Sequence, residues 1–406
     1  MLDMKISINY SRDMQSYKFK LLPNKEQQKK LNVMFGCSRF TWNYFLDLNN
    51  KIYLEAKEKE LKKKHLNYYD CANQLTELKT KNKWLKEANS QSLQQTLKDL
   101  DTAYNRFFQK KGGFPNFKSK KNKQSFRIPQ SFKLEENRTI FPKFRKGIKT
   151  IVHREIEGRI KYATIIKTKT DKYFVSVTTD LEVKKKRILD NQIGIDLGIK
   201  DFTVLSNGEK HSLKIKEGNI RFLHKQVSKK MKGSNNRDKA RLKLARRYEK
   251  IDNQKQDFQH KLSDKICKEN KLIAIEDLNV TGMVKNHCLA KSISNQSWYS
   301  FIAKLEYKAK RYRGEVVKTK RFYPSSKTCS CCGFVNQDLT LADRNWQCPR
   351  CKTELDRDIN ASQNILAQVL RELNIKGGRN YRLKPVELSS LDEAMKQEAF
   401  GSLAQR

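Results

Sequence analysis

The alternation of apolar and polar residues predicts a strand and then helices in the first quarter of the chain. Residues 15–22 (QSYKFKLL) alternate up to Pro23, as a half-buried strand does. From residue 26 to residue 108, apolar side chains recur at helical spacing with almost no helix-breaking residues. We therefore expect a helical domain here, closed by the turn-rich basic segment KKGGFPNFKSKKNKQSFRIP.

The next stretch, up to residue 183, has the shorter period of strands. The segments RTIFPKF, KTIVHR, IKYATIIKT and KYFVSVTTDLEV are short, alternate in polarity and are separated by turn residues. They are typical of a small barrel or sheet. Residues 184–190 (KKKRILD) carry mostly charge and are predicted to be a linker.

A different architecture begins at residue 192, where apolar strands alternate with helices. QIGIDLGI reads as a buried strand, FTVLSNGEKHSL as a hairpin through Asn207-Gly208, and residues 222–270 as a basic helical pair. The strand LIAIEDL, the helix SWYSFIAKLEYKAKRYR and the strand EVVKTKRF follow. This half is therefore predicted to be α/β, and the tail from residue 377 is expected to be loosely ordered.

The charge of the chain points to a polyanionic partner. With 86 Lys and Arg against 44 Asp and Glu, the formal net charge is +42, and nucleic acid is the first candidate because each neutralised phosphate releases counterions. A ribosomal or chromatin-packing protein shares this charge but rarely carries 10% aromatic residues over 406 residues. The chain has no run of 18 apolar residues and no signal-peptide core, so we expect a soluble, cytoplasmic protein without a membrane partner.

Five of the nine cysteines crowd into residues 329–351. Two Cys-x2-Cys pairs separated by fifteen residues have the spacing of a four-thiolate zinc ribbon, formed by Cys329, Cys332, Cys348 and Cys351. Because all four positions are thiolates, the zinc is expected to be structural. A redox pair or a decayed knuckle are the alternatives, and Cys331 is a possible competing ligand.

Three carboxylates lie at positions that the four-thiolate zinc site does not explain. Asp196 lies within the strand IGIDLGI, Glu276 ends the strand LIAIEDL, and Asp358 starts the helix DINASQNIL. Burying an ionised group on a strand costs several kcal/mol unless it is compensated. Acids from two adjacent strands and a helix terminus suit two Mg²⁺ ions that hydrolyse a phosphodiester, as in an RNase H-like nuclease core.

Each acid also has a purely structural interpretation. Asp356 and Asp358 are both placed to cap the helix that follows, which is a common use of Asp. Asp196 is equally consistent with a turn residue before Gly198, and Glu276 or its neighbour Asp277 with a surface charge at a strand end.

An ordered series of motifs makes the chain resemble the TnpB family, the transposon-encoded RNA-guided DNA endonucleases related to type V CRISPR effectors. The resemblance covers residues from about 15 to 370. Its motifs are YKFKLLPNKEQ, FGCSRFTWNYFL, SQSLQQTLKDLDTAYNRFF, GFPNFKSKK, GIDLGIKDF, IEDLNVTGM, LAKSISNQSW, LEYKAKRYRG, YPSSKTCSCCG, WQCPRCK and DRDINASQNI.

The resemblance implies a multidomain α/β protein with a RuvC-type (RNase H-like) nuclease core. Its implied parts are a wedge-like β-barrel (1–24 and 116–188), an inserted helical recognition domain (25–115), the nuclease core (189–324) with a basic helical insertion at about 222–270, a zinc ribbon (325–354), the C-terminal helix of the core (355–376) and a tail (377–406).

The resemblance also implies roles for individual residues. Asp196, Glu276 and Asp358 become the catalytic acids that bind Mg²⁺, while Asp356 becomes a neighbour rather than a ligand. The zinc ribbon falls on the four cysteines already named. Residues that face the target-adjacent motif map onto Tyr68, Ser90 and Gln94, although an exposed helix position is as good an account of Gln94.

The basic segment after the helical domain is expected to contact nucleic acid. It interleaves cations with aromatic rings, which suits phosphate contacts and base stacking; the candidates are Phe117, Lys118, Lys120 and Lys121. The expected activity is guided, Mg²⁺-dependent DNA cleavage by a monomeric ribonucleoprotein that carries a transposon-end guide RNA and acts on double-stranded DNA. A non-cleaving RNA-guided repressor and a carboxylate-triad transposase are the alternatives.

Overall fold

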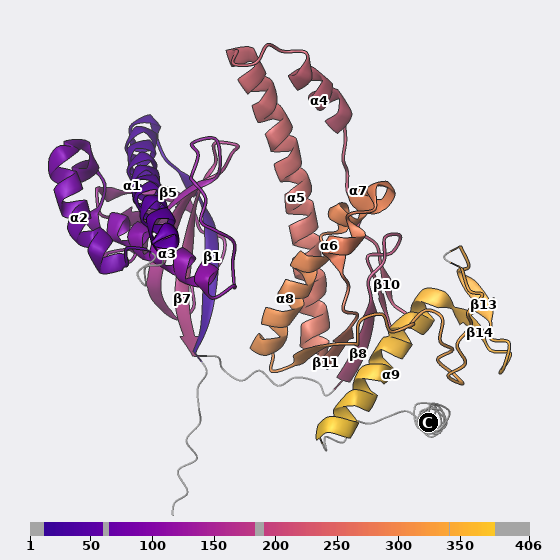
Figure 1. Ribbon diagram of the computed structural model, residues 1–406. Helices are drawn as coiled ribbons and strands as arrows, with labels where there is room; N and C mark the ends of the chain where they lie inside the picture. Colours follow the sequence, from indigo (N-terminus) through magenta and orange to yellow (C-terminus); the bar gives the residue numbers. More distant parts are fainter. Residues whose placement is uncertain (1–11, 60–64, 183–190, 341, 378–406) are drawn as a thin grey trace, which may run out of the picture. The chain divides into compact units, whose positions relative to one another are not determined.

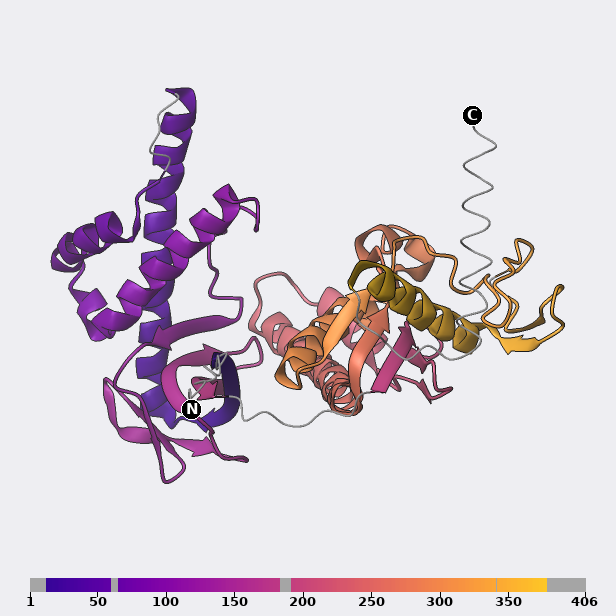
Figure 2. The same ribbon diagram turned by 90° about the horizontal axis from the view of Figure 1, so that it is seen from below.

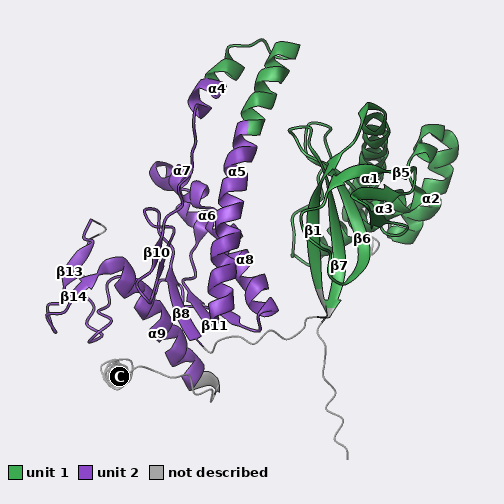
Figure 3. Ribbon diagram, turned by 180° about the vertical axis from the view of Figure 1, so that it is seen from behind, with its two compact units in different colours: residues 1–183, 225–246 green, residues 184–224, 247–406 purple. Residues whose placement is uncertain are grey.

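The computed structural model describes residues 12–59, 65–182, 191–340 and 342–377 (Figure 1). The chain divides into two compact units, residues 1–183 with 225–246 and residues 184–224 with 247–406 (Figure 3). The predicted linker and nearly all of the predicted tail lie outside the described residues.

The first unit contains a seven-stranded antiparallel sheet in the order β2-β6-β7-β1-β5-β4-β3. The sheet is strongly curved (Figure 2). The predicted strand at 15–22 is confirmed as part of β1, which lies between β7 and β5. The strands are β1 (Arg12–Leu22), β2 (Gln124–Ile128), β3 (Lys133–Glu135), β4 (Arg138–Phe141), β5 (Phe144–Ile151), β6 (Arg159–Lys167) and β7 (Tyr173–Glu182).

The helices of the first unit follow the predicted amphipathic pattern. They are α1 (Lys25–Glu58), α2 (Tyr68–Lys81), the 3-10 helix η1 (Lys83–Glu87) and α3 (Ser90–Phe108). Helix α1 begins at a capping box, in which the Asn24 and Gln27 side chains each bond the other residue's backbone N–H. Its first turns pack Leu31 and Phe35 into the core of the sheet, and its later turns pack against α2 and α3.

The second unit is built on a five-stranded mixed sheet in the order β10-β9-β8-β11-β12. Strands β8 (Asn191–Asp196), β11 (Asn270–Ile275) and β12 (Glu315–Lys318) are parallel. Strands β9 (Thr203–Leu205) and β10 (Lys210–His211) form the predicted hairpin, in which β9 pairs antiparallel with β8. Gly208 supplies the positive φ of +90° that this tight turn requires.

Helices cover both faces of this sheet. Along β11, Ile273 and Ile275 face a core shared with α5 (Asn235–Glu269) and α8 (Trp298–Arg311). Leu272 and Ala274 face the opposite side and pack on α9 (Arg357–Gly377). The period of two along the strand thus divides its side chains between two helical layers. The remaining helices are α4 (Ile220–Ser228), α6 (Val280–Met283) and α7 (His287–Gln296).

Helix α9 approaches β8 at Gly194. A Cβ at this position would collide with the backbone oxygen of Ser362 and would lie 2.9 Å from Leu366 Cβ. Gly194, the first glycine of QIGIDLGI, is therefore required by the close packing of α9 on β8. This contact sets α9 directly on the strand that ends at Asp196.

A small four-cysteine module precedes α9. Its hairpin pairs β13 (Asn345–Gln347) with β14 (Glu354–Asp356), and β14 runs without a break into α9. A second, isolated bridge joins Thr328 to Val335 across the first Cys-x2-Cys turn.

Candidate metal centres and nucleic-acid contacts

Two of the predicted acids lie side by side at the C-terminal edge of the mixed sheet. Asp196 is the last residue of β8, and Glu276 directly follows β11. Because these strands are parallel and Ile195 is in register with Ile275, the acids that follow these two isoleucines emerge at the same edge. Adjacent parallel strands thus place two carboxylates together that are eighty positions apart in the chain.

Asp358 joins them from the first turn of α9. Burial raises the pKa of Asp196 to about 7, and the charges of Glu276 and Asp358 add to this rise. The pKa of Glu276 is also raised, first by burial and then by the charge of Asp277. The charges of Glu276 and Asp358 therefore both act on the buried Asp196 carboxylate and disfavour its ionised form. The carboxylate oxygens of the three acids are farther apart than the ligand atoms of the four-cysteine cluster, which all lie within 4.8 Å of one another.

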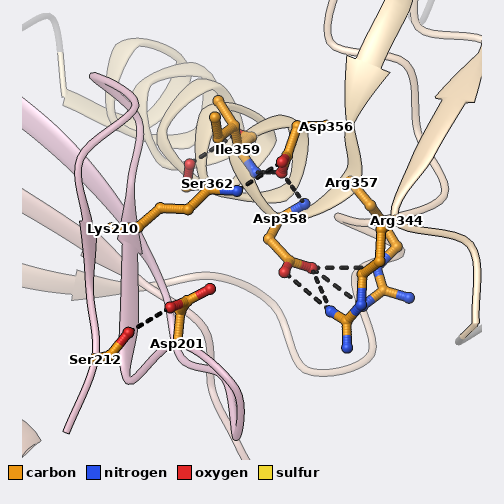
Figure 4. A network of polar contacts seen from close by, with 9 residues as sticks. All are labelled: Asp201, Lys210, Ser212, Arg344, Asp356, Arg357, Asp358, Ile359 and Ser362. Atoms are coloured by element: carbon orange, nitrogen blue, oxygen red, sulfur yellow. Dashed lines mark hydrogen bonds and ion pairs between the residues drawn. The ribbon is translucent and has the colours of Figure 1, made fainter. Parts of the chain in front are cut away.

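The carboxylate of Asp358 is turned toward two arginines (Figure 4). Arg344 Nη1 donates to Oδ2 at 3.0 Å and lies 3.4 Å from Oδ1. Arg357 donates to Oδ1 through Nε at 3.2 Å and Nη2 at 3.1 Å. Both oxygens of the third acid are thus engaged by guanidinium groups.

Asp356 caps helix α9. Its Oδ1 accepts the backbone N–H groups of Asp358 and Ile359, both at 3.1 Å. Its Oδ2 accepts from Lys210 Nζ at 2.6 Å, which ties the start of α9 to β10 (Figure 4). These contacts hold the pKa of Asp356 below its ordinary value, against the opposing effect of burial. The structural interpretation as a helix cap applies to Asp356, whereas the Asp358 carboxylate bonds Arg344 and Arg357 and its charge acts on Asp196.

The four cysteines form a closed cluster of the size that zinc requires. Cys329 Sγ lies 3.7 Å from Cys351 Sγ, and Cys332 Sγ lies 3.6 Å from Cys348 Sγ. Two thiolates about 2.3 Å from a tetrahedral zinc ion are about 3.8 Å apart, so the cluster fits the ion. The nearby Thr353 hydroxyl lowers the pKa of Cys351 to about 6, whereas burial raises the pKa of Cys329 and Cys332, so the metal-free cluster favours the thiolate at Cys351 alone among these three.

Cys331 is exposed and lies outside this cluster. The prediction that Cys329, Cys332, Cys348 and Cys351 belong together is confirmed, and Cys331 as a competing ligand is not supported.

The module is anchored to α9 by two buried asparagines. Asn360 donates to the backbone oxygen of Thr328 at 2.7 Å and accepts the N–H of Ser330 at 2.8 Å, so it holds both neighbours of Cys329. One helical turn later, Asn364 donates to the backbone oxygens of Thr328 and Ser325. Both Cys-x2-Cys turns are therefore fixed to the helix that carries Asp358, the first through asparagines and the second through β14.

The three predicted motif-reading residues lie near one another in the first unit. Ser90 and Gln94 are exposed one helical turn apart on α3, and Lys98, one turn further, lies over the Tyr68 ring at 4.9 Å from its centroid. Ser90 Oγ also accepts from Lys79 Nζ at 3.2 Å. The sequence reasoning missed both lysines, although the four-residue spacing from Gln94 to Lys98 was a usable signal.

The predicted basic segment is held against α1. The Asn43 side chain bonds both the N–H and the carbonyl of Lys118, and Trp42 Nε1 donates to the backbone oxygen of Asn116. The Lys118 ammonium lies 3.6 Å from the centroid of the Trp42 ring, and desolvation there lowers its pKa to about 8. Phe117, Lys118, Lys120 and Lys121 all keep exposed surface, and in Lys118 it is the ammonium group that lies over the Trp42 ring.

Three family models match different parts of the chain. Residues 172–287 match an IS605 OrfB model described as "Probable transposase", and residues 298–365 match "Cas12f1-like, TNB domain". Residues 14–58 match a model described as "Helix-turn-helix domain". In this chain they form a strand followed by one long helix, β1 and α1.

Curated relatives extend the similarity over nearly the whole chain. A "Putative RNA-guided DNA endonuclease" of Streptomyces pristinaespiralis is 33% identical, with 87% of this chain and 88% of the relative covered. The "Putative RNA-guided DNA endonuclease InsQ" of Escherichia coli (strain K12) is 30% identical, with 92% and 98% covered.

A solved structure shares the fold. The Cas12f1 protein in the cryo-electron microscopy structure of a Cas12f1–sgRNA–target DNA complex matches with a TM-score of 0.52 at 14% identity, over 87% of this chain and 98% of that one. In the described residues, every helix is too short or too polar to cross a bilayer.

Proposed function

Because the chain belongs to the TnpB (IS605 OrfB) family of RNA-guided DNA endonucleases, we propose that it cleaves DNA under the direction of a transposon-derived guide RNA. Pairing with the guide would select the target, and the protein would read a short adjacent motif and hydrolyse the DNA. The observation that supports this proposal is that parallel strands bring Asp196 and Glu276 to one edge of the mixed sheet, where the charge of Asp358 adds to the raised pKa of Asp196.

The fold of the second unit supports a RuvC-type, RNase H-like core. In its mixed sheet, two adjacent parallel strands each end at one acid. Helix α9, which carries the third acid in its first turn, packs against β8 at Gly194. This is the arrangement that the sequence predicts for metal-dependent phosphodiester hydrolysis.

We propose that the three acids hold two Mg²⁺ ions. The raised pKa of Asp196 reflects burial and repulsion by Glu276 and Asp358, and a bound cation would relieve both. When bound, such ions activate water and stabilise the leaving oxygen. The chain itself contributes the rigid placement: β8 and β11 fix two carboxylates, and the Asp356 cap fixes the helix that carries the third.

The four-cysteine cluster is proposed to bind a structural zinc ion. All four ligands are thiolates, so no coordination position is left for a substrate. Its proposed role is to fold the module against α9, where Asn360 and Asn364 connect it to the helix of the third acid.

The proposed partners are the guide RNA and double-stranded target DNA. Between residues 221 and 260, which cover α4 and most of α5, there are 13 Lys and Arg against 4 Asp and Glu, a surface suited to phosphates. Ser90, Gln94 and Lys98 of α3, together with Tyr68 of α2, are proposed to read the target-adjacent motif.

The domain roles follow the same proposal. Residues 1–24 and 116–188 would form the wedge, a role supported by the pairing of β1 with β5 and β7 in one sheet. Residues 25–115 would be the recognition domain, 189–324 and 355–376 the nuclease core, and 325–354 the zinc ribbon.

The test is cleavage of a target plasmid by purified ribonucleoprotein with Mg²⁺, using the co-purifying RNA to define the guide. Supercoiled plasmid should become linear, and Asp358→Ala should leave it intact while RNA binding is retained. Asp356→Ala should only slow cleavage, because it removes a helix cap worth about 1 kcal/mol. If Asp358→Ala still cuts and Asp356→Ala does not, the assignment of the third acid is wrong.

The same experiment separates the alternatives. A guided repressor would retain the RNA and bind target DNA but leave it uncut with all three acids intact. A transposase would join DNA ends by strand transfer, and the absence of a discrete co-purifying RNA would favour it. The description "Probable transposase" makes this second comparison worthwhile.

The basic segment allows a test of individual phosphate contacts. Lys120→Ala and Lys121→Ala should each reduce the slope of log affinity for RNA against log salt by about 0.7. Lys118→Ala should leave the slope nearly unchanged, because its ammonium lies on Trp42. Fluorescence anisotropy titrations with the co-purifying RNA at several salt concentrations measure these slopes. A larger effect for Lys118→Ala than for the other two would contradict this placement.

A further inference from the structure

Asp358 is held by two arginines that differ in how firmly they are fixed. The Arg357 side chain is only 10% exposed, and its Nη1 lies 3.4 Å from the backbone oxygen of Thr340. The backbone N–H of Arg357 donates to the backbone oxygen of Arg344. The Arg344 side chain is 47% exposed. In the described part of the chain, its side-chain polar contacts go to Asp358. Arg344 is therefore the one that can swing away without disturbing the fold.

The two arginines differ in the oxygen that each bonds most closely, although Arg344 Nη1 also lies 3.4 Å from Oδ1. Arg357 bonds Oδ1 through two nitrogens, whereas the 3.0 Å bond of Arg344 is to Oδ2. A carboxylate oxygen that binds Mg²⁺ directly does so at about 2.0–2.1 Å, which leaves no room for a cationic group on the same side of the same oxygen. A metal ion that approaches Oδ2 from the side of Arg344 can thus bind it only if Arg344 leaves, while Arg357 can remain on Oδ1.

We propose that Arg344 competes with the divalent metal for Asp358 and thereby sets the metal affinity of the acid site; this inference rests on the proposed metal site. Before metal binds, Arg344 neutralises the third acid. When metal binds, Arg344 releases Oδ2, and Arg357 keeps the carboxylate oriented.

The four-cysteine module places Arg344 for this role. Asn345 is paired with Asp356 in the β13–β14 hairpin, and the Arg357 N–H bonds the Arg344 carbonyl at 2.8 Å. This pairing fixes the backbone of Arg344 opposite Arg357, so its side chain reaches over Asp358 (Figure 4). The module therefore contributes a charged residue to the acid site as well as an anchor for α9.

The experiment measures Mn²⁺ binding to the RNA-free, zinc-loaded full chain by electron paramagnetic resonance, because RNA itself binds Mn²⁺. Arg344→Gln should lower the Kd by about five- to tenfold, since it removes a competing, partly exposed ion pair. Arg344→Lys keeps the charge but loses the planar fork, and its Kd should fall between those of Arg344→Gln and wild type. Zinc content and thermal melting show whether each variant is folded.

Arg321→Gln is the matched control. Arg321 pairs with Asp277 at 2.8 Å, beside Glu276, and its side chain is 53% exposed. The Arg321→Gln substitution therefore removes the same charge from a similarly exposed position without freeing a proposed ligand. The Kd of this variant for Mn²⁺ should change by less than about twofold. If Arg321→Gln matches Arg344→Gln, the effect is general electrostatics and the competition is disproved.

Two further outcomes separate this inference from the proposed function. If Asp196→Ala does not weaken Mn²⁺ binding, the acids are not the metal site and the proposed function loses its basis. If Asp196→Ala does weaken binding but Arg344→Gln leaves the Kd unchanged or raises it, the metal site stands and only the competition is wrong. Unchanged metal binding with weaker DNA binding would assign Arg344 to the substrate instead.

Discussion

Replacing Asp196 with Asn is expected to stabilise the magnesium-free protein at pH 8 by about 2 kcal/mol while abolishing cleavage. Burial and two neighbouring carboxylates raise the pKa of Asp196 from 3.8 to about 7. This corresponds to at most about 4 kcal/mol, and we expect about half because the residue retains some exposed surface. For a unit of about 200 residues, the melting temperature should rise by roughly 4–8 °C.

The pH dependence of this stability has a definite sign. The folded pKa of Asp196 lies above its unfolded value, so the folded state binds more protons between them, and wild-type stability falls as pH rises from about 4 to about 7. Asp196→Asn should remove this fall, and Mg²⁺ should restore stability only to the wild type. Thermal melts of zinc-loaded protein in magnesium-free buffer between pH 5 and pH 8 measure both effects.

Asp257→Asn is the control for that comparison. Asp257 is exposed on α5 and forms a surface pair with Lys261, so its neutralisation should change stability by less than about 0.5 kcal/mol at any of these pH values. A destabilised Asp196→Asn variant at pH 8 would show that Asp196 makes a favourable structural interaction instead of being part of a repulsive cluster.

Replacing Cys348 with Ser is expected to remove the zinc and to unfold the module around it. Cys348 is fully buried, and structural zinc sites contribute apparent binding free energies of about 10–16 kcal/mol, which a module of this size cannot replace with its small core. Native mass spectrometry should show about one zinc per wild-type chain and none in the variant. Limited proteolysis should cut within residues 325–356 only in the variant.

The same substitution should reduce cleavage strongly although all three acids remain. Loss of the module would release the contacts of Asn360 and Asn364 with the first Cys-x2-Cys turn and the β14 segment that caps α9. Cys331→Ser is the control, because Cys331 is exposed and outside the cluster, and it should retain zinc and activity. Zinc-free Cys348→Ser protein with normal cleavage would disprove the coupling.

Local sequence patterns predicted those parts of the site that depend on short-range spacing. The two Cys-x2-Cys pairs identified the closed cluster, and the acids of IGIDLGI and LIAIEDL identified two strand ends that the parallel register brings together. Such features are visible because one motif contains both the strand and its functional residue. The motif DRDINASQNI likewise placed Asp358 in the first turn of α9.

The sequence did not reveal contacts that depend on how separate elements pack. Asp356 was a candidate cap of α9 and does cap it, but its ion pair with Lys210, a residue 146 positions earlier, was not predicted. Lys118 was grouped with the other lysines of its segment, but its position on Trp42 depends on the path of the loop across α1. The sequence predicted no role for Arg344, because only the β13–β14 register shows that its side chain reaches Asp358.

The position of α9 near the end of the described chain affects how the protein is made. The helix supplies Asp358 and covers Leu272 and Ala274, which are otherwise an apolar surface of the central sheet. A ribosome that stalls before residue 357 would therefore release a product whose central sheet exposes an apolar, aggregation-prone surface and whose acid cluster lacks Asp358. We expect such truncated products to be recognised by chaperones or proteases and to be harmless to the host chromosome.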